Sequence, residues 1–482
     1  MIIEIQKIKR LFAFLDDSAV RYCHWKSNQH LAEALAGKTD LDILVDGAQA
    51  DFCRQLLRDC GCKQVVPQPR SLYPGIEDWL AFDEETGRLA HIHLHFKIIA
   101  GAQPKNYHLP LENWLLSGCG SLYDLKIAAH EKELIVLILR MAFKTRYRDL
   151  LKAWLRPAYD FLPQTIRAEL NWLLERAHTN TIIDHVRTSG MPVDGALLID
   201  FCERYTTGRI TPAYFLGLKI KLAGCLKQYR LRSFLSNQVR CLAFFIQSLL
   251  SRSPGRKTLN DRGVFFALVG ADGSGKTRLA RDLLAWLNWK VETRIIYFGI
   301  PKSARAYAWL KKTMDVIHRL KKKARPLHFN LPGNFLGAVS ETVNSLLWVY
   351  IGRRRFALSR QAKNFQTKGF VIIAERFPLK NFMGMAEPMD GPRLQKQAQR
   401  NFLCGLEHYY YRRIEMPDRL FVLRVGLAVL RERKKNTQIT NLSEKADAVN
   451  CISADDRTII VDAEAPYESV LLTIKRNIWD ML

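Results

Sequence analysis

The clearest pattern of apolar and polar positions lies in the second half of the chain. Residues 264–269 form an unbroken apolar run of strand length, and further runs of this kind alternate with segments that have helical spacing. These further runs are 295–298, 370–374, 420–425 and 458–461. Strands that alternate with helices typically form a parallel sheet with helices on its faces. The pattern therefore predicts an α/β domain in this part of the chain.

Shorter apolar runs mark the first part of the chain, and a helical pattern fills its middle. Residues 41–45 and 89–99 resemble strands and alternate with helical patterns, as in a compact α/β unit. Between residues 122 and 250 the apolar positions recur at intervals of three and four, for example at Leu134, Leu137, Ile138 and Met141. The middle of the chain is therefore expected to be helical.

A polar stretch separates these regions from the C-terminal sheet. Residues 251–262 read SRSPGRKTLNDR and have no apolar periodicity, which is typical of a linker. A chain of 482 residues is also long for a single hydrophobic core. We therefore predict a multidomain α/β protein. Its segments are an α/β domain over 1–120, a basic helical region over 121–250, the linker over 251–262 and the sheet domain over 263–482.

Composition is that of an ordinary globular protein, with 48% hydrophobic and 25% charged residues. The ten cysteines show no CxxC spacing, so a thiolate metal site is not expected. The first residues lack the apolar core of a signal peptide, and the apolar run at 242–250 is about half the length that crosses a bilayer. We expect a cytoplasmic protein and leave open a peripheral contact at the inner membrane face.

The charge of the chain is distributed unevenly. The net charge is +26, yet residues 1–125 hold 13 basic and 16 acidic side chains, against 60 and 31 in the remainder. A positive field of this kind attracts nucleotide phosphates, nucleic acid or an anionic membrane surface, and charge alone does not choose among them. A basic surface that only keeps the protein in solution would give the same count.

A glycine-rich loop connects the first strand of the sheet domain to a helical segment. Residues 270–277 read GADGSGKT and satisfy the motif GxxxxGK[ST] between a strand and a helix. Such a loop surrounds phosphate oxygens with backbone amides at a helix N-terminus. The residues that form it here are Gly270, Gly273, Ser274 and Gly275. Lys276 is expected to reach the β- and γ-phosphates of ATP, and Thr277 to bind Mg²⁺.

The form of this loop and a second motif resemble the thymidylate kinase family. Asp272 matches an acidic residue that lies near the acceptor nucleotide's sugar in that family. The sequence ERFP follows the strand expected at 370–374 and resembles the family's Asp-Arg-Tyr/Phe motif. The resemblance implies that Arg376 holds the acceptor and transferring phosphates and stabilises transition-state charge. Glu375 replaces the family's aspartate, although deoxynucleoside kinases of related fold carry Glu-Arg-Ser here, and this departure puts thymidylate itself in doubt as substrate.

Two later segments follow the order of the same family. Residues 430–435 read LRERKK and resemble its basic lid, which implies that Arg431 closes over the ATP phosphates. A solvated basic helix end would look the same. Residues 459–463 read IIVDA and resemble the strand and loop that border adenine, which assigns Asp462 to cofactor binding. The family also has an acceptor-binding arginine before the ERF strand, and its acceptor pocket would open near Pro301. The candidates for that arginine are Arg353, Arg354 and Arg355.

Alternation in the N-terminal domain brings two carboxylates to one face of a strand. These are Asp40 and Asp42, in GKTDLDILV. Carboxylates so placed can bind Mg²⁺ and the triphosphate of a nucleotide donor. The segment resembles the minimal nucleotidyltransferase fold, whose third carboxylate lies on a later strand. Here that place reads HIHLH over 91–95, and His93 stands where the family has aspartate.

The resemblance thus implies a metal site of Asp40, Asp42 and His93, altered by one neutral ligand. The histidines of HIHLH could be metal ligands or phosphate-binding cations. Three roles stay open for the domain: a degenerate binding or scaffolding role, active nucleotidyl transfer, and a different hydrolytic or metal-dependent role.

Together these features predict an ATP- and Mg²⁺-dependent kinase fused to a nucleotidyltransferase-like domain. The expected acceptor is a nucleotide or a small phosphorylated or sugar-like metabolite, and a homodimer is one expected assembly. Two alternatives stay open. The chain could be a nucleic-acid or membrane-surface binding protein with a regulatory P-loop, or a nucleotidyltransferase that modifies a macromolecule.

Overall fold

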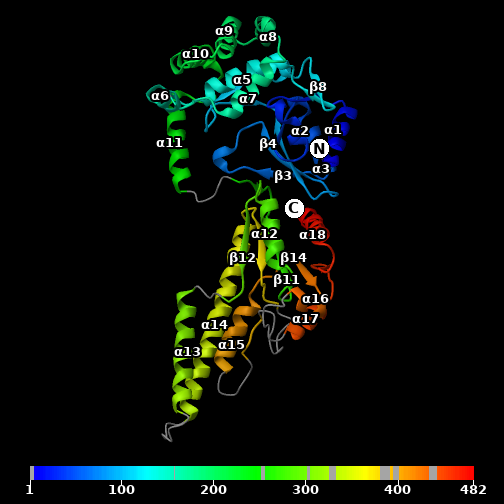
Figure 1. The fold of residues 1–482 in the computed structure, drawn as a ribbon, viewed down its shortest axis with the longest axis vertical. Helices are drawn as coiled ribbons and strands as arrows, with labels where there is room; N and C mark the ends of the chain where they lie inside the picture. Colours follow the sequence, from blue (N-terminus) through cyan, green and yellow to red (C-terminus); the bar gives the residue numbers. More distant parts are fainter. Residues whose placement is uncertain are drawn as a thin grey trace. The chain divides into compact units, whose positions relative to one another are not determined.

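The computed structural model describes residues 5–156, 158–250, 256–300, 304–324, 333–379, 391–394, 401–433 and 442–482. The chain divides into two compact units, Met1–Lys257 and Thr258–Leu482, whose elements are drawn in Figure 1. This division falls within the predicted linker, of which residues 251–255 lie outside the described ranges. The boundary expected at residue 120 lies inside the first unit.

The N-terminal unit is built on a mixed sheet with the strand order β3-β4-β5-β2-β1-β9-β8. Its strands are β1 (Tyr22–His24), β2 (Asp40–Val45), β3 (Lys63–Val66), β4 (Ile76–Phe82), β5 (Leu89–His95), β8 (Gly120–Leu122) and β9 (Leu125–Ile127). β2 pairs in parallel with β5 and antiparallel with β1, whereas β5 pairs antiparallel with β4. The run predicted at 89–99 is interrupted after β5, because the amides of Phe96 and Lys97 both donate to the carbonyl of Gly75.

Three helices accompany this sheet: α1 (Gln6–Asp17), α2 (Leu31–Leu35) and α3 (Ala50–Asp59). In α1 the buried residues are Ile8, Leu11, Phe12 and Leu15, so their spacing puts one apolar stripe against the core. These side chains share a hydrophobic cluster with Leu41, on β2. Ile43 and Val45 of β2 belong to the same cluster, so Asp40 and Asp42, which alternate with them, lie on the other face of the strand.

The rest of the N-terminal unit, from residue 98 to residue 250, is mainly helical, with the small pair β6 (Ile98–Ala100) and β7 (Tyr107–Leu109) and the strands β8 and β9 near its start. Its helices are α4 (Glu112–Leu115), α5 (His130–Lys144), α6 (Tyr147–Leu155), α7 (Gln164–Leu174), α8 (Ile182–Ser189), α9 (Gly195–Thr206), α10 (Pro212–Cys225) and α11 (Phe234–Leu250). The helical region predicted over 121–250 is thus confirmed after β9. One buried cluster joins Trp25 and Leu44 of the sheet region to α5 and α10. This shared core explains why the helical region does not form a separate unit.

The C-terminal unit contains a fully parallel sheet with the strand order β12-β13-β11-β14-β15. The strands are β11 (Phe265–Gly270), β12 (Thr293–Tyr297), β13 (Val371–Glu375), β14 (Arg419–Arg424) and β15 (Thr458–Asp462). All five strands predicted from the apolar runs are confirmed within one or two residues. Parallel strands end at the same sheet edge, so the residues that follow β11 and β13 approach each other there.

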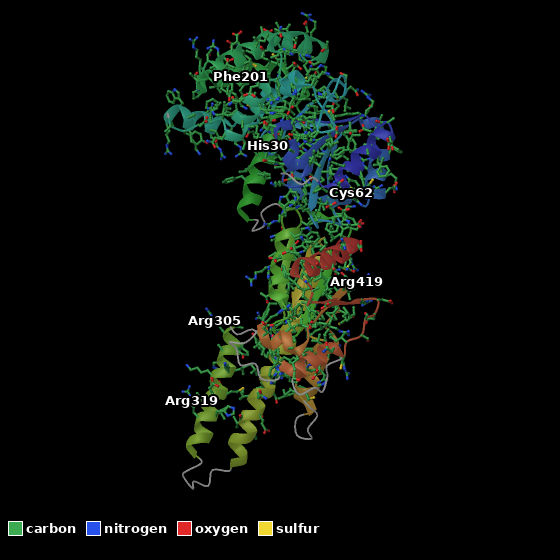
Figure 2. All side chains as sticks on the ribbon, turned by 45° about the vertical axis from the view of Figure 1, so that its right-hand side comes forward. His30, Cys62, Phe201, Arg305, Arg319 and Arg419 are labelled. Atoms are coloured by element: carbon green, nitrogen blue, oxygen red, sulfur yellow. The ribbon has the colours of Figure 1, made fainter. Side chains whose placement is uncertain are left out.

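Helices complete this unit: α12 (Lys276–Leu287), α13 (Arg305–Ala324), α14 (Gly333–Gln366), α15 (Asn401–Arg412), α16 (Leu427–Arg433), α17 (Leu442–Asn450) and α18 (Tyr467–Met481). α13 and α14 lie side by side, and Figure 2 shows Arg305 and Arg319 projecting from α13, where both are exposed. A two-residue strand, β10 (Thr258–Leu259), begins the unit. Among the described helices, none combines the length and the apolar composition that a membrane crossing requires.

Candidate functional site

The phosphate loop lies between β11 and α12, as the motif predicts. A side chain at Gly270 would be 2.5 Å from Oγ of Ser274 and 3.0 Å from the carbonyl oxygen of Leu423, so glycine alone fits this close approach. Gly275 has a φ of 90° and directly precedes α12, which begins at Lys276. The amides at the start of α12 therefore point toward the loop, where an anion is favoured.

Lys276 is folded over the loop. Its Nζ donates to the carbonyl oxygens of Gly270 at 2.8 Å and Ala271 at 2.7 Å. Ser274 is only 2% exposed, whereas Lys276 and Thr277 line a cavity at the loop. The loop thus presents an ammonium group and a hydroxyl group to the same space.

A second strand end brings an arginine to this loop. Nη2 of Arg376 lies 3.1 Å from Oδ1 of Asp272, although 104 residues separate them in sequence. Arg376 directly follows β13 and has a φ of 54°, which is uncommon for a residue with a side chain. Backbone strain of this kind persists where the surrounding structure enforces it, and it is frequent at functional sites.

Asp272 is surrounded by cations. Besides Arg376, Nζ of Lys445 from α17 lies 3.2 Å from Oδ2 of Asp272. Burial acts to raise the pKa of Asp272, but Arg376, Lys276 and Lys445 outweigh it, so the pKa lies below its usual value. The carboxylate is therefore ionised at neutral pH and holds two cationic side chains at the edge of the loop.

These groups enclose a cavity of about 340 Å³. Its lining residues are Asp272, Gly273, Gly275, Lys276, Thr277, Arg278, Glu375, Arg376 and Arg433. Oε1 of Glu375 is buried, and no group in the described ranges hydrogen-bonds to it. A buried carboxylate oxygen without a donor is costly, so this oxygen is available to a cation or to a hydroxyl group that enters the cavity.

Not every predicted residue lines this cavity. Arg431 is exposed on α16, and Arg433, two residues later, lines the cavity instead. Asp462 ends β15, is exposed, and accepts a hydrogen bond from the amide of Glu464 at 2.9 Å, so it shapes the turn there. The lid residues Lys434 and Lys435 and the pocket residue Pro301 lie outside the described residues.

Of the three arginines considered before the ERF strand, only Arg355 is buried, at 2% exposure. Its Nε donates to the carbonyl oxygen of Phe298 at 2.7 Å, and its Nη1 donates to the hydroxyl of Tyr411 at 2.6 Å. Arg353 and Arg354 are exposed on α14. Arg355 thus joins the end of β12 to α14 and α15 and does not line the phosphate cavity.

Three lining or contacting residues were missed by sequence reasoning. Arg278 directly follows the motif and places its guanidinium 3.7 Å from the ring centroid of Tyr467. Arg433 belongs to the same basic run as Arg431, and the helical phase of α16 decides which of the two lines the cavity. Lys445 has no motif, because only the fold brings it to Asp272.

A second group of polar residues lies on the sheet of the N-terminal unit. In the parallel pair of β2 and β5, Asp42 is opposite His93 and Asp40 is opposite His91. Oδ1 of Asp42 lies 3.0 Å from Nδ1 of His93 and 3.4 Å from Nε2 of His95. The structure therefore brings Asp42 and His93 together, as predicted.

Asp40 takes a different partner. Its Oδ1 lies 2.9 Å from Nδ1 of His91, which also contacts Asp78 of β4 at 3.0 Å through Nε2. The three residues whose ligand atoms lie within 4.8 Å of one another are Asp42, His93 and His95. His95 thus takes the place that sequence reasoning gave to Asp40. The sequence HIHLH already placed His95 on the same strand face as His93.

Burial keeps these histidines neutral. It lowers the pKa of His93, and it lowers the pKa of His95 to well below its usual value. Burial acts to raise the pKa of Asp42, but Lys26, with Nζ 2.7 Å from Oδ1, and the two histidines hold it well below its usual value. Two neutral imidazoles and one carboxylate form a donor set that suits a transition metal better than Mg²⁺.

Comparisons with known proteins found relatives for part of this chain. No family model matches the chain. An uncharacterised ATP-binding protein of Escherichia coli K12, YghR, is 26% identical over 220 residues, which span 42% of this chain and 82% of that protein. A second uncharacterised ATP-binding protein of the same strain, YghS, is 28% identical over 227 residues, which span 44% of this chain and 91% of that protein.

Solved structures also match this chain, with low overall similarity. Thymidylate kinase from Candida albicans matches with a TM-score of 0.28 and 18% identity, over 46% of this chain and 92% of that chain. Deoxyadenosine kinase from M. mycoides with bound dATP matches with a TM-score of 0.28 and 16% identity, over 44% and 98% of the respective chains. This chain is therefore similar, over 42–44% of its length, to proteins described as ATP-binding.

Proposed function

We propose that this chain is an ATP-dependent phosphotransferase whose C-terminal unit transfers the γ-phosphoryl group of ATP to a nucleotide or a small sugar-like metabolite. The observation that carries the proposal is the approach of Arg376 to the phosphate loop through Asp272. A P-loop alone binds phosphate in motors, switches and kinases alike. An arginine that follows a second strand and lines the same cavity supplies the charge that a transferring phosphoryl group requires.

The residues that line the cavity have different roles in this proposal. Backbone amides of the loop and the ammonium group of Lys276 hold the β- and γ-phosphates, while Arg376 and Arg433 approach the transferring group from the other elements of the cavity. During transfer the bond from the γ-phosphorus to the bridging oxygen of ADP breaks, and a bond to an acceptor oxygen forms. The ionised Asp272 fixes the position of Arg376 before the substrates bind.

Mg²⁺ fits the residues present. The hydroxyl of Thr277 and the buried Oε1 of Glu375 line the same cavity, and oxygen donors of this kind suit Mg²⁺. The ion would neutralise charge on the β- and γ-phosphates. If the acceptor is a hydroxyl group, Glu375 can instead accept its proton; a phosphate acceptor brings no such proton.

The test uses the full chain and measures ADP formation from Mg-ATP across a panel of nucleoside monophosphates, nucleosides and sugars. We expect turnover only when an acceptor is present. The variant Lys276→Ala should lose this turnover, and calorimetry should show that it also loses ATP binding. Lys312→Ala is the control, because Lys312 is an exposed lysine on α13. A chain that does not bind Mg-ATP would refute the proposal. Binding without acceptor-dependent turnover would favour a regulatory P-loop instead.

A second candidate function rests on the cluster of Asp42, His93 and His95. We propose that these side chains hold a divalent transition metal such as Zn²⁺, with Lys26 as the group that neutralises Asp42 when the metal is absent. The donor set departs from the carboxylates that nucleotidyl transfer uses, so the metal role is favoured over transfer.

Metal analysis of the purified chain after dialysis with Zn²⁺ tests this role. We expect about one equivalent of Zn²⁺ for a single closed donor set, and at least a tenfold weaker affinity in Asp42→Asn. Asp46→Asn is a matched control, because Asp46 directly follows β2 and pairs with Arg21. Equal zinc binding in Asp42→Asn would refute the role. If the chain incorporates α-labelled nucleotide into a macromolecule, and Asp42→Asn loses this incorporation, the result would favour nucleotidyl transfer as the role of the domain.

A further inference from the structure

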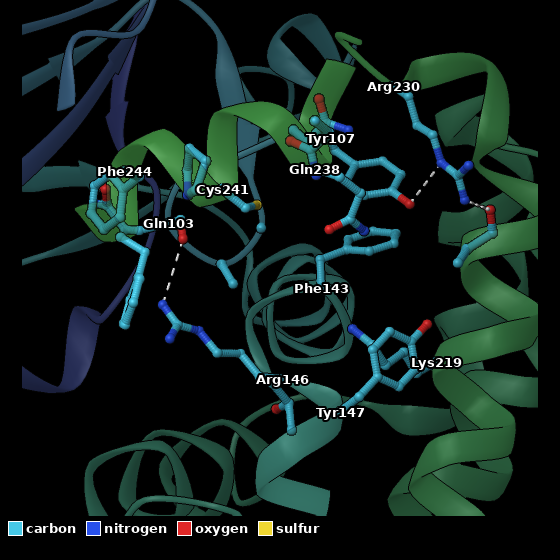
Figure 3. Close-up of a pocket in the computed structure, with 18 residues that line it drawn as sticks. Gln103, Tyr107, Phe143, Arg146, Tyr147, Lys219, Arg230, Gln238, Cys241 and Phe244 are labelled. Carbon is cyan, nitrogen blue, oxygen red and sulfur yellow. Dashed lines mark hydrogen bonds between the residues drawn. The ribbon is translucent and has the colours of Figure 1, made fainter. Parts of the chain in front are cut away.

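A pocket in the helical region of the N-terminal unit belongs to neither of these sites. It measures about 480 Å³ and lies among α5, α10, α11 and residues 101–107, as Figure 3 shows. Its aromatic residues are Tyr107, Phe143, Tyr147, Phe244 and Phe245. The rings of Tyr107 and Phe143 stack with centroids 4.0 Å apart and an angle of 21° between their planes. A volume of this size is typical of small-molecule sites, and the aromatic residues suit a planar ligand.

Three cationic side chains line this pocket. They are Lys219 of α10, Arg146 after α5 and Arg230 after α10. Nζ of Lys219 donates to the carbonyl oxygen of Ala142 at 2.6 Å and lies 5.0 Å from the ring centroid of Tyr147. The lysine is 7% exposed. Its ammonium group is therefore buried against the apolar part of the pocket.

Both arginines are partly buried, and no ion pair in the described ranges includes them. Nε of Arg230 donates to the hydroxyl of Tyr107 at 3.0 Å, and Nη2 of Arg146 lies 3.5 Å from the carbonyl oxygen of Gln103. These partners are neutral. No aspartate or glutamate is among the residues that line the pocket, and none of the ion pairs found in the described ranges includes Lys219, Arg146 or Arg230.

Buried positive charge without a carboxylate is unfavourable, and a bound anion removes the penalty. Burial lowers the pKa of Lys219 to about 8. An anion placed between Lys219 and the arginines would restore the usual preference of the lysine for its charged form. The same anion would gain charge-assisted hydrogen bonds from groups that already have fixed positions.

We propose that this pocket binds a small organic anion, in which a carboxylate or phosphate group is attached to a planar ring. The ring lies against the stacked pair of Tyr107 and Phe143, and the anionic group lies toward Lys219 and Arg146. The pocket is thus a ligand site of the N-terminal unit. It shares no lining residue with the cavity at the phosphate loop.

Calorimetric titration of the full chain carrying Lys276→Ala tests the proposal, since that change removes an ammonium group from the cavity at the phosphate loop of the other unit. The probes are phenyl phosphate, benzoate and the neutral benzyl alcohol. We expect at least one of the anions to bind ten times more tightly than the alcohol. Preference for phenyl phosphate would identify a phosphate ester as the ligand class, and preference for benzoate a carboxylate.

The variants Lys219→Met and Arg146→Gln should each weaken binding of the preferred anion at least tenfold. Lys221→Met is the control, because Lys221 is exposed on the same helix. Arg146→Gln keeps the test decisive if Lys219→Met does not fold. Equal affinity for the anions and benzyl alcohol, or unchanged affinity in both pocket variants, would overturn the proposal. Its failure would leave the phosphotransferase assay unaffected, since that assay reads Lys276 and ATP.

Discussion

Replacement of Lys219 by methionine should change the stability of the N-terminal unit by an amount that depends on pH. Burial lowers the pKa of Lys219 from its usual 10.5 to about 8, so the folded protein releases this proton more easily than the unfolded chain. At pH 7 the cost of keeping the lysine charged in the folded state is about 3 kcal/mol. As the pH rises from 8 toward 10.5 this cost disappears, because the unfolded chain also loses the proton.

The substitution has a cost of its own. Nζ of Lys219 donates to the carbonyl of Ala142, which lies in the last turn of α5, where carbonyls lack partners within the helix. An unsatisfied carbonyl costs about 1–2 kcal/mol. Lys219→Met should therefore stabilise the N-terminal unit by about 1–2 kcal/mol at pH 7, because the gain of about 3 kcal/mol exceeds this loss.

Pulse proteolysis in urea, with mass spectrometry of peptides from residues 5–250, measures the stability of this unit separately from the other. Between pH 7 and pH 9.5 the advantage of the methionine variant should shrink by about 2 kcal/mol. Lys221→Met, at an exposed position, should show no such dependence. The reasoning is refuted if the two variants behave alike, or if Lys219→Met is equally destabilising at both pH values. Higher stability with weaker anion binding would be the combined signature of a ligand site.

Three further changes test other parts of the molecule. Arg376→Gln should reduce kcat about 10²- to 10³-fold in the ADP-release assay while ATP affinity falls much less, since the lost charge acts mainly on the transferring group. Gly270→Ala should destabilise the C-terminal unit by about 1–3 kcal/mol in urea unfolding, because its Cβ would meet backbone and side-chain atoms at 2.5–3.0 Å. Burial raises the pKa of Glu133 to about 8, so wild-type stability should fall as the pH rises from 4.5 through 8, and Glu133→Gln should remove that fall in thermal unfolding between pH 5 and pH 8.5.

Sequence reasoning was most successful where the signal is local. The five parallel strands were predicted from apolar runs, and the loop from a motif that specifies its own backbone conformation. Gly270 shows why this works: the close approach of Ser274 is set within five residues of chain. The run at 89–99 was less predictable, because the turn that divides it depends on a hydrogen bond to the distant Gly75.

Residues recruited by tertiary contact could not be predicted in the same way. Lys445 reaches Asp272 only because α17 packs beside β11 and β14, and its own sequence neighbourhood carries no motif. Among Arg353, Arg354 and Arg355, helical phase decides which one is buried. That phase was uncertain, because the apolar periodicity of this 34-residue helix is weak.

The cluster of Asp42, His93 and His95 shows the same limit in a sheet. Alternation along each strand correctly placed Asp40 and Asp42 on one face and the histidines on one face. Which carboxylate meets which histidine depends on the register of β2 against β5, and register is fixed by long-range packing of the buried face. A shift of two residues would keep every side chain on its face and pair Asp40 with His93. The change in the candidate metal ligands from Asp40 to His95 therefore follows from the observed register. If this register holds, zinc affinity should fall in Asp42→Asn and stay unchanged in Asp40→Asn.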